Sequence, residues 1–247
     1  MSRTESPSCV FFARIFSMKV TLLQHTPDPE RTVALAAKLC YSAAAIGELH
    51  DRLSGSDITE FLAKIMSLGH QSVLEHASFT FGIEGISRAC SHQLVRHRLA
   101  SYSQQSQRYV TFKGDSFPLT TPPTIAESPE RLKIFNRAIK AAAKAYRELV
   151  DCGVPAEDAR FVLPNAAETK IIVTMNAREL LHFFELRCCE RAQWEIRVMA
   201  VEMLRLVKKA APVIFSSAGP GCLLGPCPEG AMTCGQAKEM RKKFASL

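Results

Sequence analysis

Apolar and polar positions along the chain follow two different periods, which predicts a mixture of strands and helices. Ala77, Phe79, Phe81 and Ile83 alternate with small or polar residues, as in a half-buried strand. Short apolar or alternating runs predict strands over 19–24, 77–83, 108–112 and 168–175. Helical spacing predicts helices over 29–41, 57–68, 86–98 and 128–151, and two more within 176–210 that break near Cys188 and Cys189.

The order of these elements favours the α+β class. The strands lie too far apart in sequence for regular βαβ units, and the chain has no internal repeat, GxGxxG motif or P-loop. We therefore expect no Rossmann fold. Loops or linkers are predicted over 42–56, 99–107 and 120–124. We expect residues 1–17 to be a poorly ordered extension, 18–215 to form a single catalytic domain, and 216–247 to form an irregular tail rich in Gly, Pro and Cys.

Composition narrows the class of protein. The chain of 247 residues is 47% hydrophobic, which is ordinary for a globular protein. It has no uninterrupted apolar run of about eighteen residues, so we expect no membrane span. An odd number of cysteines, nine, favours free thiols in a reducing compartment, and we expect a cytoplasmic protein. Cys222, Cys227 and Cys234 lie close together, but without a CxxC pair or a nearby fourth ligand we predict no metal site.

The net charge of +7 predicts an anionic partner, which could be a nucleic acid, a membrane or a small phosphorylated ligand. Segment 93–109 contains Arg96, His97 and Arg98 at the predicted end of a helix, followed by Arg108. Cations at a helix C-terminus can simply complement the helix dipole, and His97 lies on the apolar stripe, where a core histidine is the usual outcome. The hydroxyls and amides that follow favour a phosphate-binding site instead.

At this segment the chain resembles a known family. Arg-His-Arg at 96–98, followed by seven residues, Ser, one residue and Arg, is similar to the signature of flavin-dependent thymidylate synthases. The resemblance continues in GHQSVLEH at 69–76, RFVLPNA at 160–166, NARELLHFFELR at 176–187 and AQWEIR at 192–197. Together these motifs extend over most of the chain between Met18 and about residue 215.

The resemblance implies an α+β fold of helices and an antiparallel sheet, and a reductive methylation of dUMP to dTMP. It implies FAD as cofactor, with NADPH and 5,10-methylenetetrahydrofolate as co-substrates. It also implies a homotetramer whose active sites are shared between subunits. Because the arginines fall in separate segments and not in one continuous stripe, and no long apolar run occurs, we expect no nucleic-acid or membrane partner. The FAD-binding residues that it implies are Arg96, His97, Arg98, Asn176, Arg178 and His182, with Ser72 and Glu75 from another subunit. The dUMP-binding residues that it implies are Gln93, Gln104, Ser106, Gln107 and Arg108, with Arg160 and Arg187 from a neighbouring subunit.

Arg187 is the residue that we expect to act in catalysis, by stabilising negative charge on the uracil ring. It continues the apolar stripe of Leu180, Phe183 and Phe184, so its charge is expected to turn inward and to need an anionic partner. That partner is either a ligand or a salt bridge to Glu185 or Glu190.

Two other residues have an ordinary structural explanation beside a functional one. His70 follows a glycine at a helix end and either caps the helix or meets folate or nicotinamide. Trp194, the one tryptophan, is expected in the core.

Two features bear on the mechanism. The motif loop contains no cysteine, and Ser106 without an adjacent base is a poor nucleophile, which favours flavin chemistry over attack by a side chain. The family often has Asn-Glu where this chain has Ser103-Gln104, and a neutral Gln104 can bond the substrate but cannot act as a base.

The rival functions are a nucleic-acid-binding protein, which needs a continuous basic surface, and a flavoprotein reductase with another acceptor.

Overall fold

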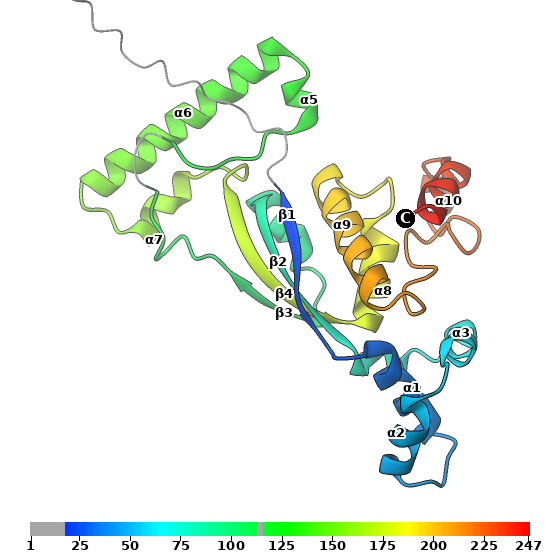
Figure 1. Cartoon of the computed structure of the whole chain (residues 1–247). Helices are drawn as coiled ribbons and strands as arrows, with labels where there is room; N and C mark the ends of the chain where they lie inside the picture. Colours follow the sequence, from blue (N-terminus) through cyan, green and yellow to red (C-terminus); the bar gives the residue numbers. More distant parts are fainter. Residues whose placement is uncertain (1–17, 113–115) are drawn as a thin grey trace, which may run out of the picture. The chain divides into compact units, whose positions relative to one another are not determined.

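The computed structural model describes residues 18–112 and 116–247 (Figure 1), so the predicted N-terminal extension lies outside the described residues. The described chain divides into two compact units. We call Met18–Glu84, Ala89–Gln105 and Lys170–Leu247 the sheet unit, and Gly85–Arg88 with the described part of Ser106–Thr169 the α6 unit. No helix within the described residues is both long and apolar enough to cross a membrane. The single catalytic domain expected over 18–215 stays a prediction.

The sheet has four strands in the order β1-β2-β4-β3. They are β1 Lys19–His25, β2 Ser78–Ser87, β3 Ala100–Gln104 and β4 Glu168–Asn176. β1 is antiparallel to β2 and β3 is antiparallel to β4, while Thr80 Oγ1 lies 2.9 Å from Thr174 Oγ1 between β2 and β4. Phe79, Phe81 and Ile83 are fully buried on one face of β2. The predicted α+β class with an antiparallel sheet is therefore confirmed.

The main core of the sheet unit lies between the strands and two helices, α8 Ala177–Arg187 and α9 Trp194–Ala210. The ring of Phe215 packs edge-on at 5.4 Å from Phe79 on β2 and at 6.0 Å from Phe184 on α8. Figure 1 shows α9 running beside α8. The prediction of two helices separated near Cys188 and Cys189 is confirmed.

Three helices and a single 3-10 turn follow β1: α1 Pro29–Leu39, α2 Ile46–Ser54, α3 Thr59–Ser67 and η1 Ser72–His76. The loop predicted for 42–56 was wrong, because Leu49 and Leu53 bury one face of α2. Asp57 lies one residue before Ile58, the N-cap of α3, and its Oδ1 accepts at 2.9 Å from the N–H of Thr59, the first residue of the helix. At the other end Gly69 takes φ 71°, which L-residues with a side chain rarely adopt.

The helix predicted over 86–98 is shorter than expected. Ile86 belongs to β2, and α4 runs only from Arg88 to Leu94. The polar segment predicted as a loop contains β3, and the strand predicted over 108–112 does not form. β3 pairs with β4, some seventy residues away, from Ala100↔Met175 to Gln104↔Ile171. Its formation therefore depends on a distant partner and not on its own apolar pattern.

The α6 unit contains α5 Pro123–Ala126, α6 Pro129–Asp151, α7 Ala156–Ala159 and the 3-10 turn η2 Arg160–Val162. Ser128 caps α6, its hydroxyl accepting from the Arg131 N–H at 3.4 Å, and Pro129 occupies the first turn, where no N–H is needed. Ile139 and Ala143 pack with Phe117 and Ala167 in a separate small core. The helix predicted over 128–151 is confirmed, whereas the linker predicted over 120–124 includes the start of α5.

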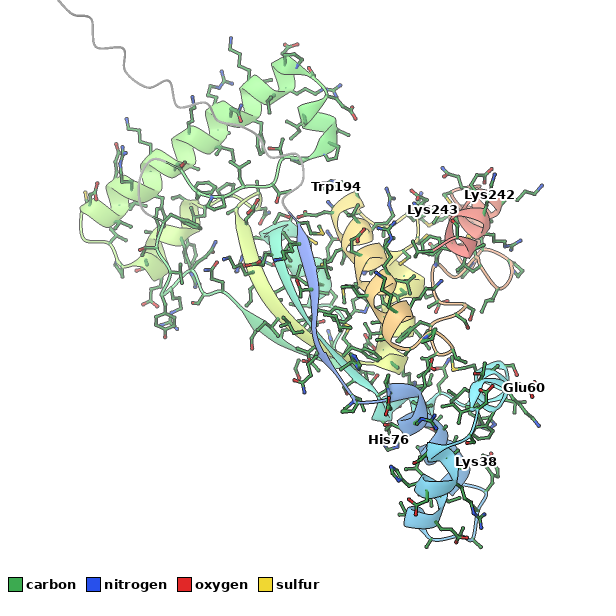
Figure 2. All side chains as sticks on the ribbon, viewed as in Figure 1. Lys38, Glu60, His76, Trp194, Lys242 and Lys243 are labelled. Atoms are coloured by element: carbon green, nitrogen blue, oxygen red, sulfur yellow. The ribbon has the colours of Figure 1, made fainter. Side chains whose placement is uncertain are left out.

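The C-terminal tail is more ordered than predicted. It contains the 3-10 turn η3 Gly230–Met232 and the helix α10 Ala237–Ala245, which buries Met240 and Phe244. Figure 2 shows the polar side of α10, with Lys242 and Lys243. The expectation of an irregular tail was wrong for α10, because two apolar residues four positions apart suffice to anchor one helix face. The eight cysteines within the described residues are free thiols.

Candidate active site

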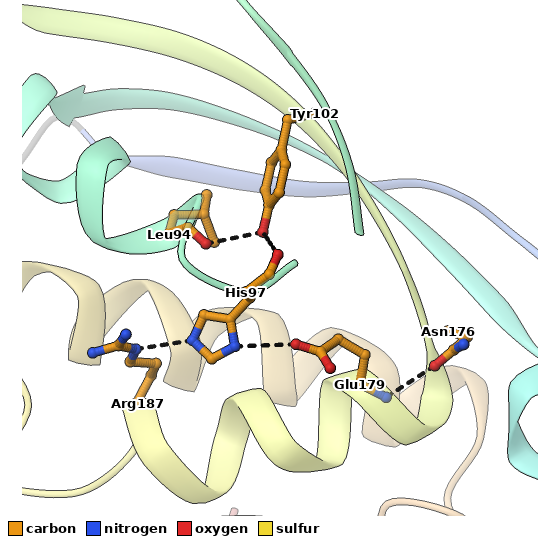
Figure 3. Close-up of polar contacts among 6 residues, drawn as sticks. All are labelled: Leu94, His97, Tyr102, Asn176, Glu179 and Arg187. Atoms are coloured by element: carbon orange, nitrogen blue, oxygen red, sulfur yellow. Dashed lines mark hydrogen bonds and ion pairs between the residues drawn. The ribbon is translucent and has the colours of Figure 1, made fainter. Parts of the chain in front are cut away.

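A tyrosine on β3 fixes the loop that follows α4 (Figure 3). The Tyr102 hydroxyl lies 2.9 Å from the Leu94 carbonyl oxygen and 2.7 Å from that of His97, and it can donate to one of them at a time. Leu94 is the last residue of α4, where carbonyls have no partner within the helix, so this hydroxyl satisfies either that carbonyl or the His97 carbonyl of the loop. Burial raises the pKa of Tyr102, which keeps the donor protonated. The loop places His97 inside and leaves Arg96 and Arg98 exposed.

His97 is 5% exposed and joins two residues of α8. Its Nε2 lies 3.0 Å from Arg187 Nε, and its Nδ1 lies 3.1 Å from Glu179 Oε1 (Figure 3). Arginine Nε can only donate, so Nε2 accepts and Nδ1 carries the ring proton toward Glu179. Burial and the Arg187 charge lower the pKa of His97, against the opposing effect of Glu179. The ring is therefore neutral.

Glu179, which is 6% exposed, is the first member of a chain of hydrogen bonds that continues through His97 to Arg187. We call it the Glu179–His97–Arg187 line. The Glu179 backbone N–H donates to Asn176 Oδ1 at 2.9 Å, so Asn176 caps α8. A carboxylate in the first turn of a helix is also stabilised by the helix dipole. The Asn176 amide nitrogen is not used by this cap. The sequence prediction missed Glu179, although an acid on the apolar stripe of α8, eight residues before Arg187, indicates a buried charge.

Arg187 is half-buried at the last turn of α8. Burial lowers its pKa, but a guanidinium stays charged in proteins. The salt bridge considered with Glu190 is not formed: Glu190 Oε2 lies 2.9 Å from Arg197 Nη1. The contact with His97 uses Nε alone and leaves the two Nη groups of Arg187 outside it. Cys90, the buried thiol that Arg187 influences electrostatically, has its pKa raised by burial and is therefore a neutral thiol.

Most of the residues predicted to bind FAD gather at the start of α8. Arg178 Nη1 lies 2.5 Å from Glu75 Oε1, and the Ala177 N–H donates to the Ala77 carbonyl at 2.8 Å, which ties α8 to the end of η1. The rings of His97 and His182 are 6.0 Å apart. The remaining members, Ser72 on η1 and Arg96 and Arg98 in the loop after α4, are exposed.

The residues predicted to bind dUMP divide between the two units. In the sheet unit, Gln104 Nε2 donates to Ser91 Oγ at 2.9 Å, and Gln93 lies on α4. In the α6 unit, Arg108 Nε donates to Glu157 Oε2 at 2.7 Å and Arg160 Nε to the Glu157 carbonyl at 3.0 Å. Both guanidiniums therefore contact Glu157, Arg108 at its carboxylate and Arg160 at its backbone carbonyl, and the sequence prediction missed this residue.

Ser106 and Gln107, which were also predicted to bind dUMP, lie in the α6 unit. The Ser106 hydroxyl accepts from the Arg108 N–H at 3.1 Å, which fixes the turn at the end of the motif. Gln107 Nε2 is buried with no hydrogen-bond partner within the described residues. Arg88, not predicted from the sequence, has its pKa lowered first by burial and then by the charge of Arg160. The cations of this unit that could bind an anion are therefore Arg88, Arg108 and Arg160, one more than the sequence motifs indicate.

The other two residues with alternative explanations are now placed. The His70 N–H donates to the Ile65 carbonyl at 3.3 Å and the Gly69 N–H to that of Met66 at 3.1 Å, which together close the C-terminus of α3. His70 therefore caps the helix through its backbone, while its side chain is exposed. Trp194, expected in the core, is only half-buried at the start of α9.

Comparison with known proteins identifies the family of this chain. The family model described as thymidylate synthase complementing protein, Thy1, matches residues 21–213. A flavin-dependent thymidylate synthase of Geobacter sulfurreducens is 73% identical over 230 residues, covering 93% of this chain and 99% of that protein. Those of Clostridium tetani and Pyrococcus furiosus are 51% and 46% identical, covering 94% and 93% of this chain and 98% of each relative. The chain therefore belongs to the Thy1 family of flavin-dependent thymidylate synthases.

Proposed function

We propose that this chain catalyses the reductive methylation of dUMP to dTMP, with FAD as cofactor, 5,10-methylenetetrahydrofolate as carbon donor and NADPH as the source of electrons. The observation that carries the proposal is the Glu179–His97–Arg187 line, since it holds a guanidinium at the end of α8 through a neutral imidazole. Family membership supports the reaction, and this arrangement supports Arg187 as the residue that acts on the substrate.

The donors on the sheet unit suit a cofactor with a pyrophosphate. Arg96 and Arg98 are exposed on both sides of His97, and Arg178 stands 2.5 Å from Glu75 at the start of α8. Guanidiniums bind phosphate oxygens with two parallel hydrogen bonds. The unused Asn176 amide and the exposed His182 and Ser72 add neutral donors. We assign these residues to FAD.

Arg187 acts on the pyrimidine. Its Nη groups donate to the uracil carbonyl oxygen on which negative charge develops, while Nε stays with His97. His97 must be neutral for this, because an imidazolium would have no lone pair on Nε2 and would repel the guanidinium. When bound, FAD supplies the hydride that completes the methyl group. Arg108, Arg160 and the neighbouring Arg88 bind the dUMP phosphate.

The Cys90 thiol, which Arg187 influences, supports flavin chemistry rather than attack by cysteine on the ring. A nucleophilic cysteine needs a lowered pKa, whereas burial and Glu195 raise the pKa of Cys90 beside Arg187. We further propose that the chain forms a homotetramer whose subunits share active sites, and that it is located in the cytoplasm.

The test compares Arg187→Ala with Arg205→Ala, which removes an exposed arginine of α9 paired with Glu202. We expect Arg187→Ala to retain FAD, to lose about two to four orders of magnitude in kcat/KM for dTMP formation, and to bind dUMP more weakly. Arg205→Ala should match the unchanged protein. Normal turnover by Arg187→Ala would refute the role of Arg187. Purified protein that binds no FAD, or oxidises NADPH without any need for dUMP and folate, would refute the function.

A further inference from the structure

Two side chains of β3 reach from the sheet to α4. Residues 100, 102 and 104 of this strand are half-buried, whereas the two residues between them are exposed. Gln104 Nε2 donates to Ser91 Oγ at 2.9 Å, in the body of α4. The Tyr102 hydroxyl lies 2.9 Å from the carbonyl oxygen of Leu94, at the end of that helix. Because Ser91 and Leu94 are three residues apart, they share one face of α4, and β3 holds that face at two points.

The Tyr102 hydroxyl also holds the loop that follows α4. It lies 2.7 Å from the His97 carbonyl oxygen, closer than to that of Leu94 (Figure 3). The Leu94 carbonyl has a backbone partner as well, because the His97 N–H donates to it at 3.1 Å. Within the described part of the chain the His97 carbonyl accepts from this hydroxyl alone. Backbone carbonyls away from water need a donor, so the phenol matters most to His97.

His97 joins the loop to both parts of the proposed site. Its backbone carbonyl is held by Tyr102, and its ring Nε2 accepts from Arg187 Nε at 3.0 Å. Arg96 and Arg98, which we assign to FAD, are its neighbours in the same loop. A shift of the loop backbone would therefore move the two FAD arginines and the partner of Arg187 together.

Tyr102 is itself firmly placed. It pairs with Val173 in the antiparallel ladder between β3 and β4, and Val173 is fully buried. A tyrosine side chain has only two rotatable bonds before the ring, so a fixed backbone leaves the hydroxyl little freedom. Burial raises the pKa of this hydroxyl, and the charge of Glu179 raises it further. The group therefore stays protonated, and remains a donor, at neutral pH.

We propose that Tyr102 is a positioning residue of the active site. Its hydroxyl sets the loop after α4, so that the two arginines of that loop bind FAD and its histidine contacts Arg187. This inference rests on the proposed function, because it names the residue that arranges that site. Tyr102 acts through the loop backbone and not on the substrate. Loss of the hydroxyl should therefore weaken FAD binding and the chemical step together.

The experiment compares Tyr102→Phe with Tyr146→Phe in the full-length protein. Tyr146 on α6 is buried, and its hydroxyl has no hydrogen-bond partner within the described residues, so its removal is the matched control. FAD affinity is measured by titration, and kcat and KM for dUMP at saturating FAD. We expect Tyr102→Phe to weaken FAD binding about three- to tenfold and to lower kcat by a similar factor, with a smaller change in KM. Tyr146→Phe should match the unchanged protein in all three quantities.

These quantities separate positioning from general damage. A partly unfolded protein fills fewer FAD sites, but the sites that remain keep the same dissociation constant. An unchanged dissociation constant in Tyr102→Phe would therefore overturn the proposal, even if less FAD is bound, and leave the proposed function intact. Unchanged protein that forms no dTMP would instead refute the proposed function, and the FAD titration alone would then decide the role of Tyr102.

A second measurement follows the loop directly. The N–H groups of Val95, Arg96 and His97 donate to carbonyls of α4, so their hydrogen exchange reports how firmly the loop is closed. At saturating FAD, we expect exchange in a peptide covering these residues to be about three- to tenfold faster in Tyr102→Phe than in the unchanged protein. A peptide from α9 should exchange equally in both. Equal exchange in the loop peptide would also overturn the proposal.

Discussion

Arg178 and Glu179 are adjacent in sequence yet belong to different environments. Arg178 is exposed and pairs with Glu75, whereas Glu179 is buried and accepts from His97. Because successive residues of a helix point about 100° apart, one turn of α8 serves both the surface and the interior. A buried carboxylate is tolerated only with a partner, so Glu179 and His97 depend on each other.

Removal of the Glu179 carboxylate should loosen His97 and with it Arg187. We expect Glu179→Ala to lower the free energy of unfolding by about 1–3 kcal/mol, because the Nδ1–H of His97 is left buried without an acceptor. A loss of positioning worth about 1.4 kcal/mol would lower kcat about tenfold, with a smaller change in KM. Denaturant unfolding and steady-state kinetics measure the two effects.

A conservative variant separates positioning from general damage. Glu179→Gln keeps an acceptor for His97 and should recover most of the stability and part of kcat. Glu202→Ala on α9 removes an exposed ion pair and should change stability by about 0.5 kcal/mol or less. Equal losses for Glu179→Ala and Glu179→Gln would contradict a role that depends on the hydrogen bond.

His97 should make the protein sensitive to acid. Its pKa is lowered in the folded chain by burial and by Arg187, so the unfolded chain takes up a proton first as the pH falls below about 6.5. Stability from the neutral ring is fully present above that pH and is lost on acidification, by at most about 1.4 kcal/mol per pH unit. Unfolding curves between pH 7.5 and 5 should be flatter for His97→Asn than for His92→Asn, which changes an exposed histidine. Parallel curves for the two variants would contradict this assignment.

Among the elements, those with a strong local pattern were predictable from the sequence. β2, α6 and the pair α8 and α9 bury residues at a regular period, and their predicted bounds agree with the structure to within a few residues. β3 was not predictable, because its sequence ASYSQ is polar and its pairing partner is distant. At the site, two separate sequence motifs pointed to His97 and Arg187, but only the fold reveals that these residues contact each other.

The tail of the sheet unit provides a test of close packing. Gly221→Ala would place a methyl group 2.8 Å from Pro228 Cγ, so we expect a loss of about 1–3 kcal/mol from overpacking. Gly225→Ala meets nothing within 4 Å and should be nearly neutral. Thermal unfolding of the two variants checks the difference. Similar melting temperatures would mean that the tail is not closely packed around Gly221.

At the scale of the whole molecule, the residues assigned to dUMP fall on both compact units, with Arg108 on the α6 unit and Arg187 on the sheet unit. Sites shared between subunits of a homotetramer can be tested by mixing. Arg108→Ala and Arg187→Ala should each be inactive, but their co-expression should restore about a quarter of the activity if each site takes the two arginines from different chains. Mixing after purification, without subunit exchange, serves as the control. No recovery on co-expression would place both arginines in one chain.

The proton between His97 and Glu179 can serve as a spectroscopic probe of the site. It is held on Nδ1 by a buried carboxylate and faces no solvent, so its exchange with water should be slow. Such a hydrogen gives its own magnetic resonance line in protein carrying isotopically labelled histidine, well apart from the lines of exposed rings. The line would sense the arrival of any ligand at Arg187 through the imidazole, without a coloured cofactor or a chemical turnover.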